Sequence, residues 1–143
     1  MAIKKYGSAE WQGGLKNGKG TISTQSGALD SYPYGYKQRF EGLKGSNPEE
    51  LIGAAHASCF SMALSLMLEK EGLTADYIKT KAEITLEEVE GGFAVSGSHL
   101  IMTAKIPGVD DAKFKQIADK AKEGCPISKL LVTKITLDAS LEE

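Results

Sequence analysis

The stretch from Asn47 to Gly72, NPEELIGAAHASCFSMALSLMLEKEG, predicts one long helix and is the sharpest structural signal in the sequence. Asn47 is suited to cap the helix, Pro48 fits its first position, and Glu50 stands where its side chain can reach back to the cap. Gly72 readily adopts the left-handed conformation that ends a helix. We therefore expect a helix from this cap to the residue before Gly72.

The middle of this helix resembles a membrane span. Leu51 to Leu68 holds 18 residues without Asp, Glu, Lys or Arg, which reaches the usual threshold. As a helix it would be ~27 Å long, slightly short of a ~30 Å hydrocarbon core. It also carries His56 and three serines, and its flanks are acidic. A central helix buried on most sides within one domain fits better, so we expect no membrane partner.

Strands and helices are predicted after the long helix. From Ile78 to Glu88 apolar and polar residues alternate, as in a half-buried strand, and a glycine-rich turn leads to a second strand, Phe93–Ile106. Asp110 or Asp111 then opens a helix that runs through Lys122. Gly124 closes it, Pro126 begins a short helix, and Leu131–Leu141 alternates as a final strand.

The first forty residues read as short strands broken by glycines. The candidates are Ile3–Trp11, Gly20–Thr24 and Gly35–Phe40, with Tyr32–Gly35 as a turn. Because the strand pairs are joined by turns, the predicted class is α+β, with an antiparallel sheet packed around a central buried helix.

Length and composition limit the classes of function. The chain has 143 residues, 41% of them hydrophobic, which is enough for one packed domain over residues 1–143. The net charge is 17 − 19 = −2, so we expect no nucleic-acid partner. No apolar run follows the charged N-terminus, and we expect a cytoplasmic location.

Cys125 is one of two cysteines, and it directly precedes Pro126. Proline at the first helical position makes Cys125 the expected N-cap of a helix, where free N–H groups and the helix dipole favour a thiolate. The alternative is that Cys125 fills a small space between two helices. The local sequence leaves both interpretations open.

Cys59 lies in the middle of the long helix among apolar residues, which raise the pKa of a thiol. By itself this pattern favours an inert structural cysteine. A reactive Cys59 needs a cation from elsewhere, and Arg39 is the only arginine in the chain. A single arginine among 16 lysines suggests a position that needs a planar guanidinium, although a surface strand arginine fits as well.

A metal site is the other chemistry that cysteines and histidines suggest. The two cysteines are 125 − 59 = 66 positions apart, without a Cys-x-x-Cys pair, so a zinc ribbon is excluded. Cys59, Cys125, His56 and His99 would supply four ligands by number alone. We disfavour that site because His56 and Cys59 are one helical turn apart and His99 falls in a strand.

Two motifs stand out in the sequence. The first is Arg39–Gly42 (RFEG) followed by Asn47–Ser65 (NPEELIGAAHASCFSMALS), and the second is Gly124–Ser128 (GCPIS). Together they resemble the motifs of the OsmC/Ohr family. The resemblance covers essentially the whole chain. Isoleucine after the proline of the second motif, in place of tyrosine or phenylalanine, favours the OsmC branch.

The resemblance implies a thiol-dependent peroxidase that reduces organic hydroperoxides to alcohols in oxidative and osmotic stress defence. It implies that Cys59 forms a sulfenic acid, which Cys125 resolves as a disulfide. It implies that Arg39 and Glu49 assist the Cys59 thiolate. A dithiol reductant of the lipoyl type, an OsmC-like fold and an intertwined homodimer are implied too, with no metal, flavin or haem.

The spacing of Glu49 and Cys59 bears on the dimer. Ten residues of one helix correspond to ~15 Å of rise, too far for both side chains of one chain to share a site. Either the helix breaks, for which Gly53 is suited, or Glu49 serves Cys59 of a second chain.

Two other functions compete with a peroxidase. One is a non-catalytic small-molecule-binding stress protein whose thiols are incidental. The other is a dimeric structural domain in which Cys59 and Cys125 are plain core residues. Neither requires two thiols and an arginine to act together.

Overall fold

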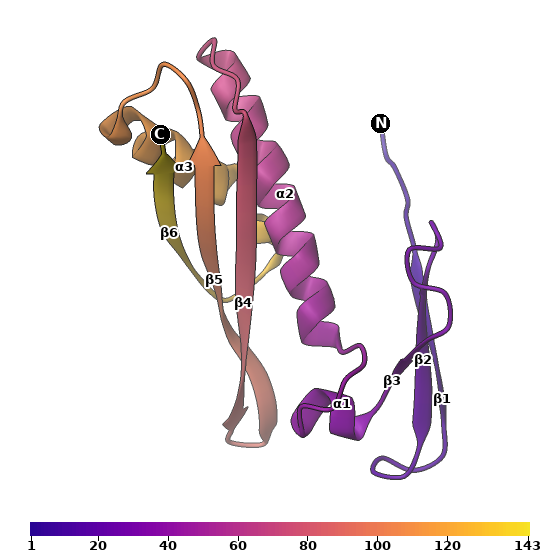
Figure 1. Ribbon diagram of the computed structural model, residues 1–143. Helices are drawn as coiled ribbons and strands as arrows, with labels where there is room; N and C mark the ends of the chain where they lie inside the picture. The colour runs from indigo at the N-terminus through magenta and orange to yellow at the C-terminus, as the bar shows by residue number, and fades with distance from the viewer. The chain divides into compact units, whose positions relative to one another are not determined.

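A computed structural model describes residues Met1 to Glu143, which group into two compact units, Met1–Leu51 and Ile52–Glu143. Each unit is described by itself, with its elements labelled in Figure 1. The elements are a mixture of strands and helices, which confirms the predicted α+β class. The single domain predicted over residues 1–143 stays a prediction.

The first unit contains a three-stranded antiparallel sheet. Its strands β1 (Gly7–Gln12), β2 (Lys19–Thr24) and β3 (Tyr32–Tyr34) are neighbours in that order. The first two strands were predicted within a few residues. β3 occupies the segment where the sequence predicted a turn.

The segment predicted as a strand over Gly35–Phe40 is a short helix, α1 (Tyr36–Phe40). Its two aromatic residues are separated by three polar ones, and so short a segment carries no clear helix or strand period. In the structure the rings of Tyr36 and Phe40, four residues apart, contact each other with centroids 5.0 Å apart. Residues at this spacing lie on the same side of a helix, and this contact favours helix over strand.

The long helix α2 (Pro48–Lys70) begins as predicted and ends one residue before the predicted end at Glu71. The Asn47 side chain accepts a hydrogen bond from the Glu50 N–H at 2.8 Å and donates one to the Glu50 carboxylate at 2.9 Å. Gly72 has a φ of 73° and its N–H donates to the carbonyl of Glu69. At both ends of α2, therefore, backbone groups without a partner in the helix itself form hydrogen bonds with residues close by in the sequence.

One face of α2 is buried in the second unit, and the opposite face is exposed in the single chain. The helix lies lengthwise beside the sheet (Figure 1). A side chain added at Gly53 would come within 2.9 Å of the Ala82 carbonyl oxygen, and Ser61 hydrogen-bonds Thr80 at 2.7 Å. By length and composition α2 would also reach across a membrane. Its buried face is the stripe Gly53, His56, Phe60, Leu64 and Leu68.

The second sheet is formed by β4 (Tyr77–Val89), β5 (Gly92–Lys105) and β6 (Lys134–Glu142) in that order. β4 and β5 are antiparallel, but β5 and β6 are parallel, which corrects the wholly antiparallel sheet that we expected. The cause is the connection, because α3 (Asp111–Gly124) and α4 (Pro126–Leu130) carry the chain back between β5 and β6.

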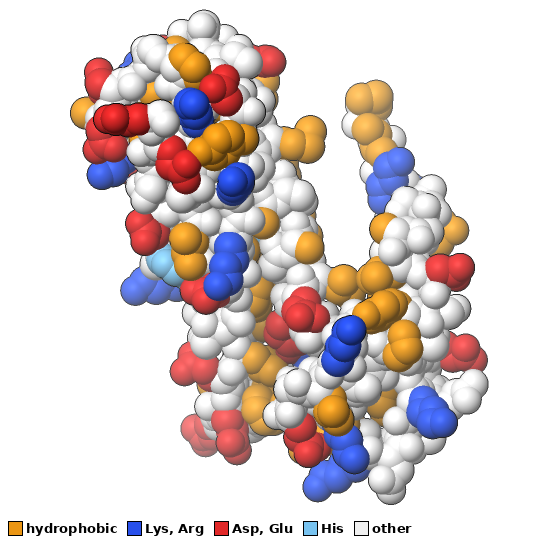
Figure 2. Space-filling model, in the orientation of Figure 1, with side chains coloured by type: hydrophobic (Ala, Val, Ile, Leu, Met, Phe, Trp, Pro, Cys, Tyr) orange, Lys and Arg blue, Asp and Glu red, His pale blue; other side chains and the backbone are white.

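The core of the second unit joins α2, β5 and α3. Alternate side chains of β5 point into it, and Cys125 closes it near α4. On the visible face of the molecule, acidic and basic side chains are interspersed (Figure 2). The buried apolar residues are Phe60, Leu64, Leu68, Leu100, Met102, Ala104, Ile106, Phe114, Ile117, Ala118, Ala121 and Cys125.

Gly53→Ala is expected to destabilise the protein. The added Cβ would lie 2.9 Å from the backbone oxygen of Ala82, so α2 and β4 must move apart. Such overpacking costs about 1–3 kcal/mol, more than the ~1 kcal/mol that alanine gains over glycine in a helix. Urea unfolding measures the difference. Gly14→Ala, where a Cβ meets nothing within 4 Å, is the control, and equal stability of both variants would refute the close packing.

Candidate active site

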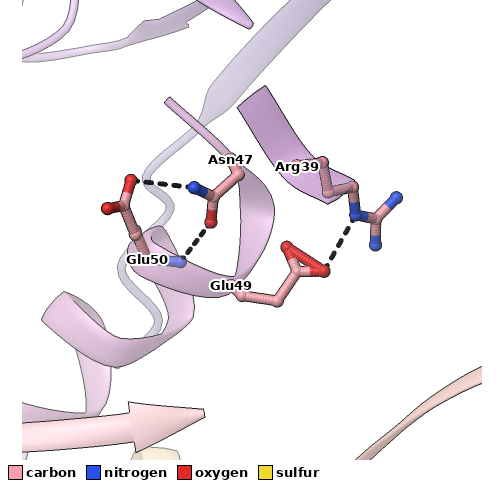
Figure 3. Close-up of polar contacts among 4 residues, drawn as sticks. All are labelled: Arg39, Asn47, Glu49 and Glu50. Atoms are coloured by element: carbon pink, nitrogen blue, oxygen red, sulfur yellow. Dashed lines mark hydrogen bonds and ion pairs between the residues drawn. The ribbon is translucent and has the colours of Figure 1, made fainter. Parts of the chain in front are cut away.

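Arg39 and Glu49 form an ion pair within the first unit. Arg39 lies on α1 and Glu49 in the first turn of α2, and Arg39 Nε donates to Glu49 Oε1 at 2.8 Å (Figure 3). The Glu49 side chain is 13% exposed, and its second oxygen, Oε2, is buried without a hydrogen-bond partner. An unpartnered buried carboxylate oxygen is costly, so this oxygen is ready to accept a proton donor. The structure thus brings together two residues that the resemblance implies to assist Cys59, and that role itself stays a prediction.

Cys59 and Cys125 come together in the second unit. Cys59 is half-buried on α2, whereas Cys125 is fully buried at the N-cap of α4, the position predicted for it. Both are free thiols, and they lie close enough that each shifts the pKa of the other. The two residues are 66 positions apart in the sequence (125 − 59), so the fold makes this contact.

The surroundings shift the pKa values of the two thiols in opposite directions. Burial raises the pKa of Cys59, and its interaction with Cys125 raises this pKa further. A hydrogen bond from the Ile127 N–H acts in the opposite direction and lowers it. Burial also acts to raise the pKa of Cys125. Hydrogen bonds from Cys59, from the Ser128 N–H and hydroxyl, and from the Ile127 N–H outweigh it and hold the pKa of Cys125 below its ordinary value. Within this unit, therefore, the surroundings favour the thiolate of Cys125 and disfavour that of Cys59.

An apolar groove of about 830 Å³ opens beside Cys59. It is contained within the second unit and runs along the exposed side of α2 to the start of α4. An apolar groove next to a thiol suits a ligand with a hydrocarbon part. Its apolar lining includes Ala55, Met62, Ala63, Leu66, Met67 and Ile127.

His56 is a site residue whose hydrogen bonding the sequence did not predict. Its ring is fully buried, with Nδ1 2.6 Å from the Ser98 hydroxyl and Nε2 2.8 Å from the Ser128 hydroxyl. Burial lowers the pKa of His56 and so favours the neutral ring. The sequence feature that could have pointed to His56 as a site residue was its position three residues before Cys59, on the buried stripe of α2. Both serines come from distant segments.

The structure also bears on two alternatives raised by the sequence, a break in the long helix and a metal site. α2 is unbroken through Gly53, so the proposed helix break between Glu49 and Cys59 does not occur. No three His, Cys, Asp or Glu side chains converge in a way that would hold a metal ion. His99 instead hydrogen-bonds Thr136 of β6.

Residues 41–140 match the family model described as OsmC-like protein. The chain belongs to the OsmC family. It is 54% identical over 142 residues to Peroxiredoxin OsmC of Escherichia coli (strain K12), covering 99% of both chains. It is 32% identical over 124 residues to Organic hydroperoxide resistance protein OhrB of Bacillus subtilis (strain 168), covering 86% of this chain and 88% of the relative.

Solved structures show the same fold. An OsmC-like protein from Mycoplasma pneumoniae matches with a TM-score of 0.75 at 17% identity, over 100% of both chains. The crystal structure of OhrB of Bacillus subtilis matches with a TM-score of 0.68 at 24% identity, over 96% of this chain and 98% of that one. The OsmC-like fold predicted from the two sequence motifs is thereby confirmed.

The two thiols are expected to titrate as a coupled pair. In the reduced protein, the ultraviolet absorbance of thiolates should rise in two steps, one below and one above the pKa of an ordinary cysteine. In Cys125→Ala, Cys59 loses the hydrogen bond that raises its pKa, so its step should fall below the upper step of the unmodified protein. In Cys59→Ala, Cys125 loses the interaction that lowers its pKa, so its step should move above the lower step of the unmodified protein. Two independent steps that neither substitution moves would contradict the contact.

Proposed function

We propose that this OsmC-family protein is a thiol-dependent peroxidase that reduces organic hydroperoxides to alcohols in oxidative and osmotic stress defence. The observation that carries the proposal is the direct interaction of Cys59 and Cys125 at the edge of an apolar groove. The relatives named peroxiredoxin and organic hydroperoxide resistance protein support it.

The reaction needs two thiols with different tasks. In the first step the Cys59 thiolate attacks the distal peroxide oxygen, the O–O bond breaks, and the alkoxide takes a proton to leave as the alcohol. Cys59 is then a sulfenic acid. In the second step Cys125 sulfur bonds to Cys59 sulfur, and the S–O bond breaks to release water. Cys59 is the first nucleophile because it is half-buried beside the groove, whereas Cys125 is fully buried.

Arg39 and Glu49 complete the proposed catalytic set. Burial and Cys125 raise the pKa of Cys59, so a nearby cation is required to favour its thiolate. We assign that role to the guanidinium of Arg39, which Glu49 orients through the 2.8 Å hydrogen bond at Nε. The unpartnered Oε2 of Glu49 is an acceptor for the proton of the hydroperoxide.

We propose that the active protein is an intertwined homodimer. On the unbroken α2, Glu49 and Cys59 are separated by ~15 Å of helical rise. Two α2 helices that cross antiparallel would bring Glu49 of one chain to Cys59 of the other. The exposed face of α2 suits this contact because Met62 and Leu66 are 76% and 52% exposed in the single chain.

We propose a dithiol of the lipoyl type as the reductant. Its alkyl chain matches the apolar lining of the groove, and its two thiols convert the Cys59–Cys125 disulfide back to two thiols while forming their own disulfide. A cytoplasmic location is proposed as well, since free thiols persist in a reducing compartment.

Substitution of each cysteine is expected to give a different defect. Cys59→Ser should abolish consumption of cumene hydroperoxide, because no other thiol reaches the groove. Cys125→Ser should consume about one equivalent and then stop in an oxidised form, because the sulfenic acid has no partner. Peroxide consumption with excess dithiol, together with dimedone labelling, measures both. Equal and near-normal turnover in both variants would refute the assignment.

The dimer is tested by mixing Glu49→Ala with Cys59→Ser protein. A heterodimer with sites shared between chains has one complete site and should regain up to half of the normal activity. Subunit exchange is verified separately by native mass spectrometry. Exchange without any recovery would place Glu49 and Cys59 of the same site on one chain.

Organic hydroperoxides are expected to react faster than hydrogen peroxide. Each methylene buried in the groove contributes ~0.8 kcal/mol, so two or three groups raise kcat/KM by roughly one to two powers of ten. Arg39→Ala should slow all substrates alike, because it serves the thiolate. The measurement compares cumene hydroperoxide, tert-butyl hydroperoxide and hydrogen peroxide. Equal kcat/KM values would instead support a protein whose groove serves another ligand.

A further inference from the structure

The groove beside Cys59 contains a second kind of sulfur. Its lining includes the side chains of two methionines of α2, Met62 and Met67, as well as Cys59 itself. The chain has four methionines. Of the other two, Met1 is fully exposed at the N-terminus, and Met102 is buried in the core with 1% exposure. Half of the methionines therefore line the groove that we assign to the hydroperoxide.

Met67 reaches the part of the groove where α3 ends. It follows Cys59 by eight residues on α2 (67 − 59), which corresponds to ~12 Å of helical rise. Long side chains of a helix lean toward its N-terminus, so Met67 leans back toward the turn of Cys59. Its ε-methyl group lies beside Gly124, because a Cβ added at Gly124 would be 3.3 Å from it. Gly124 directly precedes Cys125, so the end of the Met67 side chain lies near the residue that we propose to resolve Cys59.

The two methionines of the groove differ in how firmly they are held. Met62 is 76% exposed in the single chain and lies on the face of α2 that we propose for the second chain. Met67 is only partly exposed and packs against the core of the second unit. Of the two thioethers, that of Met67 is therefore the one held in place beside a ligand inside the groove.

A thioether is the second group in this groove that a hydroperoxide can oxidise. A lone pair of the sulfur attacks the terminal peroxide oxygen, the O–O bond breaks, and the alkoxide takes the hydrogen of the transferred oxygen to leave as the alcohol. Methionine loses two electrons to become the sulfoxide, and the hydroperoxide gains them. A thiolate is the stronger nucleophile, so reduced Cys59 reacts first. Once Cys59 is held in a disulfide, this competition ends.

We propose that Met67 is an oxidation site whose sulfoxide lowers the affinity of the groove for organic hydroperoxides when the dithiol reductant is exhausted. This use of the site rests on the proposed function. The sulfoxide is polar, whereas the neighbouring lining at Ala63, Leu66 and Ile127 is apolar. Each substrate methylene that loses its apolar contact lowers kcat/KM roughly fourfold. A thiol-dependent sulfoxide reductase reverses the change, converting two thiols to a disulfide while the oxygen leaves as water.

The site is tested in the Cys59→Ser protein, which lacks the competing thiol. The protein is treated with cumene hydroperoxide or with hydrogen peroxide, and tandem mass spectrometry locates each sulfoxide. Hydrogen peroxide should oxidise by exposure, with Met1 first. With cumene hydroperoxide the ratio of Met67 to Met1 oxidation should be roughly tenfold higher, because the groove binds the organic group. This ratio cancels the different reactivities of the two reagents, and unoxidised Met102 verifies that the core stays folded.

An equal ratio with both reagents would overturn the inference, since exposure alone would then decide the oxidation. Oxidation of Met62 in preference to Met67 would overturn the assignment to Met67.

The effect on activity is tested in the protein with both cysteines. It is treated with excess cumene hydroperoxide without dithiol, and the disulfide is then reduced. We expect kcat/KM for cumene hydroperoxide to fall roughly fourfold or more, while the value for hydrogen peroxide is retained. Met67→Leu, a substitution of similar volume, should keep its own untreated value. Met62→Leu is the matched control and should lose activity as the unsubstituted protein does.

A fall in kcat/KM that Met67→Leu does not prevent would overturn the role of the sulfoxide. If the untreated protein reduces no hydroperoxide, the proposed function fails. The sulfoxide ratio in the Cys59→Ser protein still decides the oxidation site in that case, because it requires no turnover.

Discussion

The close approach of α2 to the second sheet is the constraint on which the rest of the structure depends. Gly53 leaves room for the Ala82 carbonyl, and the helix then lies against β4 and β5 along a single stripe. That stripe buries His56 and places Cys59 at its margin, half-buried and facing the start of α4. The close packing fixes the rotation of α2 about its axis, and this rotation sets which side of the helix lines the groove and brings Cys59 near Cys125.

The second unit gives the two thiols different environments, which suit the two roles that we propose for them. Cys125 is buried and inaccessible but receives hydrogen bonds that favour its thiolate, whereas Cys59 is accessible but has a raised pKa. A resolving thiol benefits from the first environment. A peroxidatic thiol in the second environment requires a cation, and Arg39, held by Glu49, is the arginine that the chain supplies. The proposed reaction thus uses two thiols whose environments the second unit sets, together with the Arg39–Glu49 ion pair that forms in the first unit.

Local signals in the sequence predicted the parts of the fold that local interactions determine. The cap at Asn47, the stop at Gly72 and the N-cap position of Cys125 are each set by neighbours within a few residues. The strand expected over Gly35–Phe40 was wrong because a pattern of six residues fits a helix as well, and the contact between Tyr36 and Phe40 favours the helix. The parallel direction of β6 and the bonds of His56 depend on segments far apart in sequence. Alternation along a single strand does not encode its direction or its distant partners.

The central claim is that Cys59 and Cys125 act as one redox pair within a chain. Its most direct test treats the reduced protein with one equivalent of cumene hydroperoxide, then alkylates free thiols, digests without reduction and identifies the cysteine peptides by mass. We expect one disulfide joining the peptide of Cys59 to that of Cys125, with loss of both free thiols. Cys59 oxidised beyond the sulfenic acid while Cys125 remains a free, alkylated thiol would contradict it.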